Sequence, residues 1–158
     1  AMTASVCNLR PESRGEIVIT SPAPMAHPAI RPNYLSTPGD RAVAADSIRL
    51  TRKIMKAPSM QQYSPEEYLP GDSIDDQEAL ENSAGDIGTT IFHPVSTCRM
   101  GEDDGAVVDS RLRFRGIDRL RVIDASVMPA LVSGNTSSPP DMIAEKGAEM
   151  IQEAARRA

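Results

Sequence analysis

The chain has 158 residues, of which 40% are hydrophobic and 25% are charged, and its formal net charge is −5. A nucleic-acid module would be expected to carry a basic excess, and only three Tyr and two Phe are available to stack on bases. No apolar run approaches the roughly 18 residues of a membrane-spanning helix. These counts exclude nucleic acid as a partner and a membrane span, and they leave a domain of ordinary size.

The cysteine and histidine content argues against a metal site. Cys7 and Cys98 lie far apart, and with His27 and His93 they form no CxxC or HxxxH spacing. We therefore expect no metal.

Both thiols are expected to be free, as in a reducing compartment, with one long-loop disulfide as the alternative. A cytoplasmic location is expected, with peripheral attachment of a full-length enzyme to a membrane left open.

The first half of the chain predicts one strand and two helices. Residues 15–20 alternate and are β-branched, which predicts a strand, and five prolines favour an extended loop over residues 21–38. A helix is expected to begin with Thr37 as N-cap and to end at Pro58, and a shorter acidic helix to run from Ser73 to near Gly85. The apolar stripe expected on the first helix comprises Val43, Ser47, Leu50 and Ile54, widened by Ala44, Ile48 and Met55.

The second half predicts short strands followed by a helix. The strand candidates are residues 89–93, 106–108, 112–114 and 120–123, with a turn at Asp109–Ser110. Ser138 and Asp141 approximate a capping box that opens the C-terminal helix. The buried stripe expected on this helix comprises Ile143, Gly147, Met150, Ile151 and Ala154. This mixture predicts an α+β fold, with an antiparallel or mixed sheet and flanking helices.

Four polar residues of the second half each have an ordinary structural explanation when taken singly. His93 could be a hydrogen-bonding histidine, Cys98 a buried thiol, Asp124 a turn former and Asn135 a loop residue at positive φ. Their order forms a longer pattern, however. The pattern comprises HPVSTCRMG at 93–101, VVD at 107–109, LRVIDASVMP at 120–129, GNTSSP at 134–139 and MIAEK at 142–146.

This pattern resembles the C-terminal signature of the glucose–methanol–choline (GMC) oxidoreductases, flavin-dependent enzymes that oxidise alcohols, and most of all their choline dehydrogenase-like members. Residues 9–15, 21–24 and 31–36 resemble the beginning of the family's substrate domain. Ser96 stands where the family usually has Gly, and the family's GxGxxG loop for FAD is not found. The resemblance therefore implies the C-terminal part of a longer enzyme whose FAD-binding domain lies elsewhere.

The resemblance also implies roles for individual residues. His93 matches the active-site histidine, and Asn135 matches a second active-site position that is His or Asn across the family. Histidine can accept a proton near neutral pH, whereas Asn can only hydrogen-bond. His93 is therefore expected to take the hydroxyl proton while a hydride passes to flavin N5, and Asn135 to orient the substrate oxygen.

The implied flavin contacts lie around the start of the last helix, whose amides and dipole would stabilise negative charge on the reduced flavin. The residues expected to bind FAD are Asp124, Ala125, Asn135, Thr136 and Ser137. Cys98 and Arg99 are expected to support the turn behind His93.

The family's organisation implies that residues 1–119 are part of the substrate-binding domain and that residues 120–158 are a strand and helix that return to the FAD domain. Without that domain, Ile143, Met150 and Ile151 are expected to be exposed, so that the chain alone would self-associate, retain little or no FAD and be inactive. The alternatives are an FAD-containing lyase that cleaves cyanohydrins without net redox chemistry, and a standalone module without activity. The sequence leaves the alcohol undefined, and choline, another primary alcohol and a polyol stay open.

Overall fold

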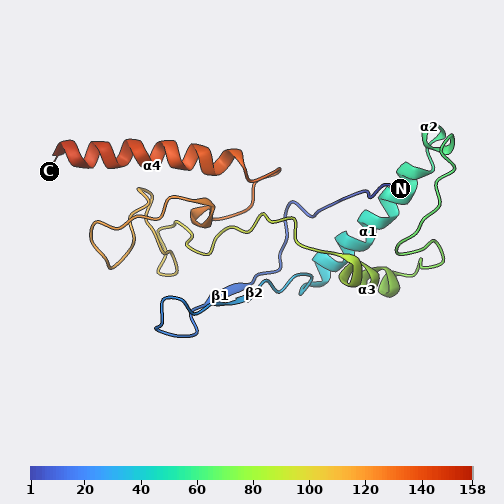
Figure 1. Ribbon diagram of the computed structural model, residues 1–158, viewed down its shortest axis with the longest axis horizontal. Helices are drawn as coiled ribbons and strands as arrows, with labels where there is room; N and C mark the ends of the chain where they lie inside the picture. The colour runs from blue at the N-terminus through green and yellow to red at the C-terminus, as the bar shows by residue number, and fades with distance from the viewer. Residues whose placement is uncertain (158) are drawn as a thin grey trace. The chain divides into compact units, whose positions relative to one another are not determined.

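The computed structural model describes residues 1–157 (Figure 1), and the chain divides into two compact units, Ala1–Ile91 and Phe92–Ala158. The regular elements of the described residues are four α-helices, one short 3-10 helix and a two-stranded antiparallel sheet. The α+β class is therefore confirmed, with a sheet much smaller than expected. The boundary at residue 119, which concerns a whole enzyme, stays a prediction.

The sheet of the first unit pairs β1 (Glu16–Val18) with β2 (Ala29–Arg31) in the register Glu16↔Arg31. β1 lies inside the predicted strand, whereas β2 lies in the segment that we expected to be a loop, and that expectation is wrong. β2 has only three residues, too few to show the alternation of apolar and polar side chains that predicts a strand. It is a strand because its backbone is hydrogen-bonded to β1. Gly15 allows the close approach of the two strands, because a Cβ there would lie 2.3 Å from the carbonyl oxygen of Arg31.

The first helix, α1 (Pro38–Met55), begins as predicted, since the Thr37 side chain accepts a hydrogen bond from the Asp40 amide at 3.2 Å. It ends three residues before Pro58, which instead opens the single turn of α2 (Pro58–Gln61). Proline lacks the amide hydrogen that the first helical position leaves unused, so it starts a helix as readily as it stops one.

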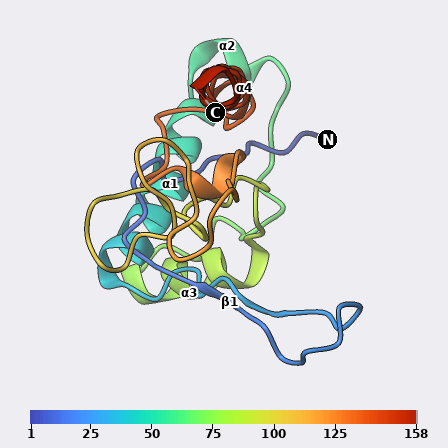
Figure 2. The same ribbon diagram turned by 90° about the vertical axis from the view of Figure 1, so that its left-hand side faces the viewer.

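The second packed helix of this unit is α3 (Gln77–Ile87), which lies beside α1 in both Figure 1 and Figure 2. Its N-cap is Asp76, three residues after the predicted start, and the Asp76 carboxylate accepts from the Ala79 amide at 3.0 Å. Ala45 on α1 and Leu80 on α3 are fully buried. The predicted stripe of α1 is wrong in part, because Val43, Leu50 and Ile54 are exposed and the small face around Ala45 is the buried one.

The Asp40 carboxylate joins the first turn of α1 to the N-terminal segment. It is almost completely buried and accepts hydrogen bonds from the Asn8 side chain (3.0 Å) and from the amides of Glu12 (2.9 Å) and Ser13 (2.7 Å). Burial alone would raise the pKa of Asp40, but the hydrogen bonds from Ser13, Glu12 and Thr37 outweigh it and lower the pKa below its ordinary value. Asp40 is therefore a buried anion held by donors.

The second unit contains α4 (Ser138–Arg157) and the 3-10 helix η1 (Ala125–Val127). The strands expected at 106–108, 112–114 and 120–123 are reduced to isolated bridges, among them Val108↔Phe114 and Arg113↔Arg121, and no strand is assigned at 89–93. Leu112 and Arg119 both have a φ of 61°, and this left-handed backbone interrupts the extended segments. The turn expected at Asp109–Ser110 is present, with the Asp109 carboxylate accepting from the Arg111 amide at 2.9 Å.

An apolar core holds the second unit together. It comprises Val108, Leu112, Val127, Met128 and Ile143. The expected exposure of Ile143 is therefore wrong, since this side chain is only 6% exposed and closes the core. Ile151 is exposed as expected, Met150 is half-buried, and Ala154, which we expected to be buried, is exposed.

Two further features complete the fold. Cys7 and Cys98 are both free thiols. Among residues 1–157, no helix has the length and apolar character needed to cross a membrane.

Candidate active site

His93 and Thr136, 43 residues apart in the sequence, meet in the second unit. The Nδ1 atom of His93 lies 2.9 Å from the Thr136 Oγ1 atom and 3.1 Å from the carbonyl oxygen of Phe92. Thr136 is buried, whereas the imidazole ring is half-exposed. The geometry thus brings together two of the predicted site residues.

The partners of Nδ1 determine where the imidazole carries its proton. A carbonyl oxygen can only accept a hydrogen bond, so the contact with Phe92 requires a proton on Nδ1, whereas the Thr136 hydroxyl can accept from Nδ1 or donate to it. The Phe92 contact therefore favours the tautomer with the proton on Nδ1. In the neutral ring, Nε2 then holds the lone pair. Within the described residues Nε2 makes no hydrogen bond, so it is available to take a proton.

The backbone on both sides of His93 is left-handed, with a φ of 62° at Phe92 and 75° at Ser96. Such φ values favour glycine, the residue that the resemblance leads us to expect at position 96. The Ser96 hydroxyl donates to the Met128 carbonyl at 2.7 Å, and this bond offsets part of the backbone strain. The substitution therefore leaves the turn behind His93 intact.

Main-chain hydrogen bonds tie this turn to the segment that carries Asp124 and Ala125. The Cys98 amide donates to the Ser126 carbonyl at 3.0 Å, and the Met100 amide donates to the Val127 carbonyl at 2.9 Å. Asp124 is exposed and acts as the N-cap of η1, accepting from the Ser126 amide at 2.8 Å. Ala125 is half-buried.

The expected supporting role of Arg99 agrees with its contacts. Its guanidinium donates to both carboxylate oxygens of Asp103, at 2.8 and 2.5 Å. These hydrogen bonds hold the pKa of the Asp103 carboxyl well below its usual value. The ion pair closes the loop that follows Cys98 and is largely open to solvent.

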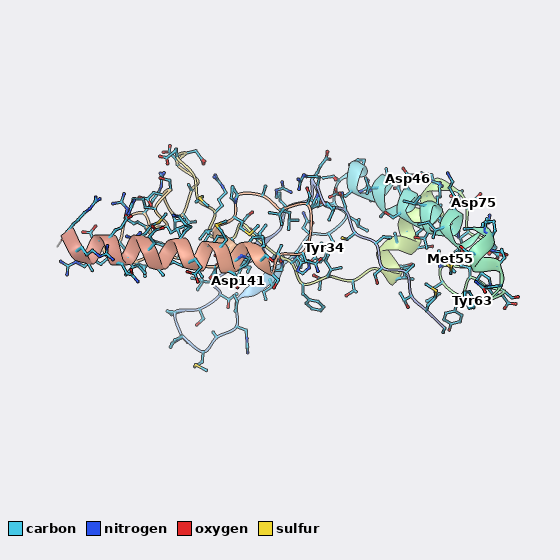
Figure 3. The ribbon with its side chains drawn as sticks, turned by 90° about the horizontal axis from the view of Figure 1, so that it is seen from above. Tyr34, Asp46, Met55, Tyr63, Asp75 and Asp141 are labelled. Carbon is cyan, nitrogen blue, oxygen red and sulfur yellow. The ribbon has the colours of Figure 1, made fainter. Side chains whose placement is uncertain are left out.

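The remaining site residues lie in the loop before α4 and differ in how far their side chains are exposed. Asn135 and Ser137 are exposed, while Thr136 between them is buried. The helix begins at Ser138, one residue earlier than a capping role for Ser138 requires. Its first turn also contains two prolines without amide hydrogens and the Asp141 carboxylate (Figure 3), so it offers an anion fewer donors than we expected.

Sequence reasoning missed the contact of Thr136 with His93. Thr136 was expected only to bind flavin, and nothing in its spacing from His93 predicts that the two side chains meet.

The described residues contain no cluster of three or more potential metal ligands. Two cavities of about 280 and 400 Å³ are lined by arginine-rich surfaces elsewhere and include none of the predicted site residues.

The sequence profile of the GMC oxidoreductases matches residues 11–144, most of the chain. The chain belongs to the GMC oxidoreductase family. This confirms the resemblance carried by the motifs around His93, Asp124 and Asn135.

Individual GMC relatives are similar over nearly the whole chain. An alcohol dehydrogenase [acceptor] of Pseudomonas putida and an oxygen-dependent choline dehydrogenase of Proteus mirabilis are each 45% identical over 149 residues, which is 94% of this chain. The chain spans only 27% of the length of these two relatives. An FAD-dependent oxidoreductase from Chaetomium thermophilum superposes with a TM-score of 0.88 at 31% identity, over 94% of this chain and 26% of that one.

Proposed function

We propose that the chain supplies the proton-accepting histidine of an FAD-dependent alcohol oxidoreductase. The observation that supports this most directly is that both contacts of the His93 ring, with the Phe92 carbonyl and the Thr136 hydroxyl, fall on Nδ1, which favours a lone pair on Nε2 and leaves Nε2 without a protein partner among the described residues. The names of the two relatives, an alcohol dehydrogenase and a choline dehydrogenase, favour an alcohol as the substrate.

The residues of the chain suit the proton side of alcohol oxidation. His93 Nε2 takes the hydroxyl proton as the alcohol becomes a carbonyl compound, and the exposed amide of Asn135 hydrogen-bonds the substrate oxygen. The Nδ1–H group stays bound to Phe92 and Thr136, so the imidazolium that forms keeps its orientation. A bound flavin supplies the acceptor for the two electrons and the hydrogen that leave the carbon.

The residues present fit one edge of a flavin. Asn135 and Ser137 expose polar side chains beside the N-terminal end of α4, which favours negative charge. Asp124 and Ala125 lie at the start of η1, which main-chain bonds tie to the segment behind His93. We propose that these residues hold the flavin together with a dinucleotide-binding domain, and that the chain alone retains little FAD and turns over no substrate.

We further propose that the exposed apolar surfaces of the chain pack against that domain and against the remainder of the substrate domain. Ile17 on β1 and Ile30 on β2 are 51% and 65% exposed, and Leu50 on α1 is 55% exposed. A two-stranded ribbon is barely stable alone, so added strands would stabilise it. In the isolated chain, these surfaces would promote self-association.

A chimera tests the proposed activity. The matching 27% of the Pseudomonas putida relative is replaced by this chain, and the rate of flavin reduction is measured anaerobically with an alcohol. We expect flavin reduction, and we expect His93→Ala to slow it by about 10²- to 10⁴-fold, the usual contribution of a general base. His27→Ala, which changes the other histidine of the chain, is the matched control and should leave the rate unchanged.

Two outcomes would contradict the proposal. One is a chimera whose flavin is reduced equally fast with and without the His93 imidazole. The other is a chimera that cleaves a cyanohydrin but whose flavin is not reduced by any alcohol, which would support the lyase alternative.

A further inference from the structure

We propose that Thr136 is a positioning residue for His93. Its hydroxyl holds Nδ1 as the protonated nitrogen, so that Nε2 remains the proton acceptor. This inference rests on the proposed function of His93, and it gives Thr136 a role different from the flavin contact that the sequence implied.

The burial of Thr136 supports this role. It and Asp40 are the two buried polar or charged residues of the described chain, and Thr136 is the one in the second unit. A buried hydroxyl needs a hydrogen-bond partner, and the Thr136 Oγ1 atom has His93 Nδ1 at 2.9 Å. Threonine is also stiff at χ1, so burial of the side chain fixes the direction of the hydroxyl. The hydroxyl is therefore held against the ring rather than directed to solvent.

The second acceptor on Nδ1 cannot replace Thr136. Phe92 immediately precedes His93, so its carbonyl oxygen moves with the same segment of chain as the ring. Because the peptide between the two residues is planar, the distance from this oxygen to Nδ1 depends on the torsions of His93 alone, so the contact does not tie the ring to another part of the unit. Thr136 comes from a different segment, next to the start of α4, and therefore anchors the ring to the unit.

Removal of the hydroxyl should release the ring. In Thr136→Val the shape of the side chain is kept, but Nδ1–H loses its 2.9 Å acceptor and retains only Phe92. The proton can then move to Nε2, where water accepts it. The fraction of His93 with a lone pair on Nε2 should fall, whereas Thr136→Ser keeps the hydroxyl and should keep the fraction high.

The tautomer of His93 can be measured directly in the 158-residue chain. The chain contains only two histidines, so a ¹⁵N-histidine-labelled sample gives two imidazole patterns, and His27 serves as the internal reference. In a neutral imidazole, two-bond ¹H–¹⁵N correlations distinguish the protonated nitrogen from the one with a lone pair, and the spectra are recorded at a pH where no imidazolium pattern is seen. We expect protonated Nδ1 in the wild type and in Thr136→Ser, and a mixture of both tautomers in Thr136→Val.

A matched control uses the other histidine. The Thr20 hydroxyl donates to the His27 carbonyl at 2.9 Å, so Thr20→Val removes a threonine hydroxyl near a histidine without touching His93. Its His93 pattern should be that of the wild type. A wild-type His93 pattern in folded Thr136→Val would overturn the inference. A folded Thr136→Ser with protonated Nε2 would overturn it as well, and that variant gives an answer even if the valine variant does not fold.

The tautomer measurement needs neither flavin nor alcohol, so its failure is distinct from failure of the proposed function. In the chimera, Thr136→Val should slow flavin reduction by about 2- to 10-fold, the factor that corresponds to one hydrogen bond. Thr136→Ser should restore the rate to within about 2-fold, since it restores that bond. A chimera without any flavin reduction but with protonated Nδ1 in the wild type would refute the activity alone.

Discussion

The two units differ in what they bury. Ala1–Ile91 encloses a carboxylate, Asp40, and two apolar residues, Ala45 and Leu80, whereas Phe92–Ala158 encloses a cluster of five apolar side chains around Val108. The first unit relies on polar contacts elsewhere too, since Arg52 donates to both carboxylate oxygens of Glu67 at 2.8 Å. Its larger apolar side chains lie mostly on the outside.

The two units therefore differ in how far their own residues fix their geometry. The second unit has a core of its own and holds the His93–Thr136 pair, so its geometry is set from within. The first unit exposes Ile17, Ile30 and Leu50, which suits a surface completed by other parts of a GMC enzyme. Substitutions in each unit test this contrast.

The largest effect is expected at Leu80, which with Ala45 makes up the buried apolar residues of the first unit. Leu80→Ala should lower the free energy of unfolding by about 2–5 kcal/mol, because it removes transfer free energy and leaves a cavity. Hydrogen exchange, read separately for α1, α3 and α4, should show the loss in α1 and α3 only. Leu50→Ala on the exposed face of α1 should change stability by no more than about 0.5 kcal/mol. Equal losses in the two variants would contradict the burial contrast.

Asp40→Asn should cost about 2–4 kcal/mol, because an amide cannot accept from the Ser13 and Glu12 amides on both of its heavy atoms. The folded-state pKa of Asp40 is lowered, so its contribution is present above the unfolded pKa of about 3.9 and is lost as the pH falls through the folded pKa. Urea unfolding between pH 2 and pH 7 should therefore show a free energy of unfolding that falls less steeply with acid in the variant than in the wild type. Asp46→Asn changes an exposed carboxylate on the same helix (Figure 3) and should leave both the free energy of unfolding and its pH dependence nearly unchanged.

The helical glycines give opposite predictions in the two units. In α4, a Cβ on Gly147 would lie 2.6 Å from Ile123 Cγ2, so Gly147→Ala should destabilise the second unit by about 1–2 kcal/mol despite its better helix propensity. In α3, Gly85 has nothing within 4 Å of such an atom, so Gly85→Ala should stabilise the first unit by about 0.5–1 kcal/mol. Thermal unfolding measures both. A stabilising Gly147→Ala would show that α4 is packed less closely than the structure has it.

The smallest effect is expected at Ser96. Ser96→Gly relieves a φ of 75° but removes the hydrogen bond to Met128, so the two contributions should cancel to within about 1 kcal/mol. Ser96→Ala keeps the strain and loses the bond, and it should be the less stable variant by about 1 kcal/mol. The reverse order in a melting experiment would mean that the hydroxyl does not offset the strain.

Much of the helical part of the fold could be predicted from the sequence, because capping residues act locally. Thr37 caps α1 as expected, and α4 begins within one residue of its predicted start. The strands could not be predicted equally well. Alternation of apolar residues near Val108 is the pattern of a strand, but the left-handed residues Leu112 and Arg119 and the absence of neighbouring strands among the described residues leave single bridges.

The candidate site could be predicted as a set of residues but not as an arrangement. The motifs place His93 and Asn135 in the family pattern, which the family match confirms, while their roles stay predictions. The contact of Thr136 with His93 joins positions 43 residues apart and depends on how the loop before α4 folds. The exposure expected for Ile143 in the chain alone is wrong for a related reason, since the core that covers it is built from the bridged loops.

The left-handed backbone that flanks His93 limits which amino acids this loop can accept. At positions 92 and 96, with φ values of 62° and 75°, β-branched residues would clash with their own carbonyl groups, whereas Gly and Asn fit. A substitution library in this loop would therefore lose most of its folded members at these two positions. At the exposed Asn135 and Ser137 the backbone places no such demand, so what limits substitution there is the proposed contact with substrate and flavin.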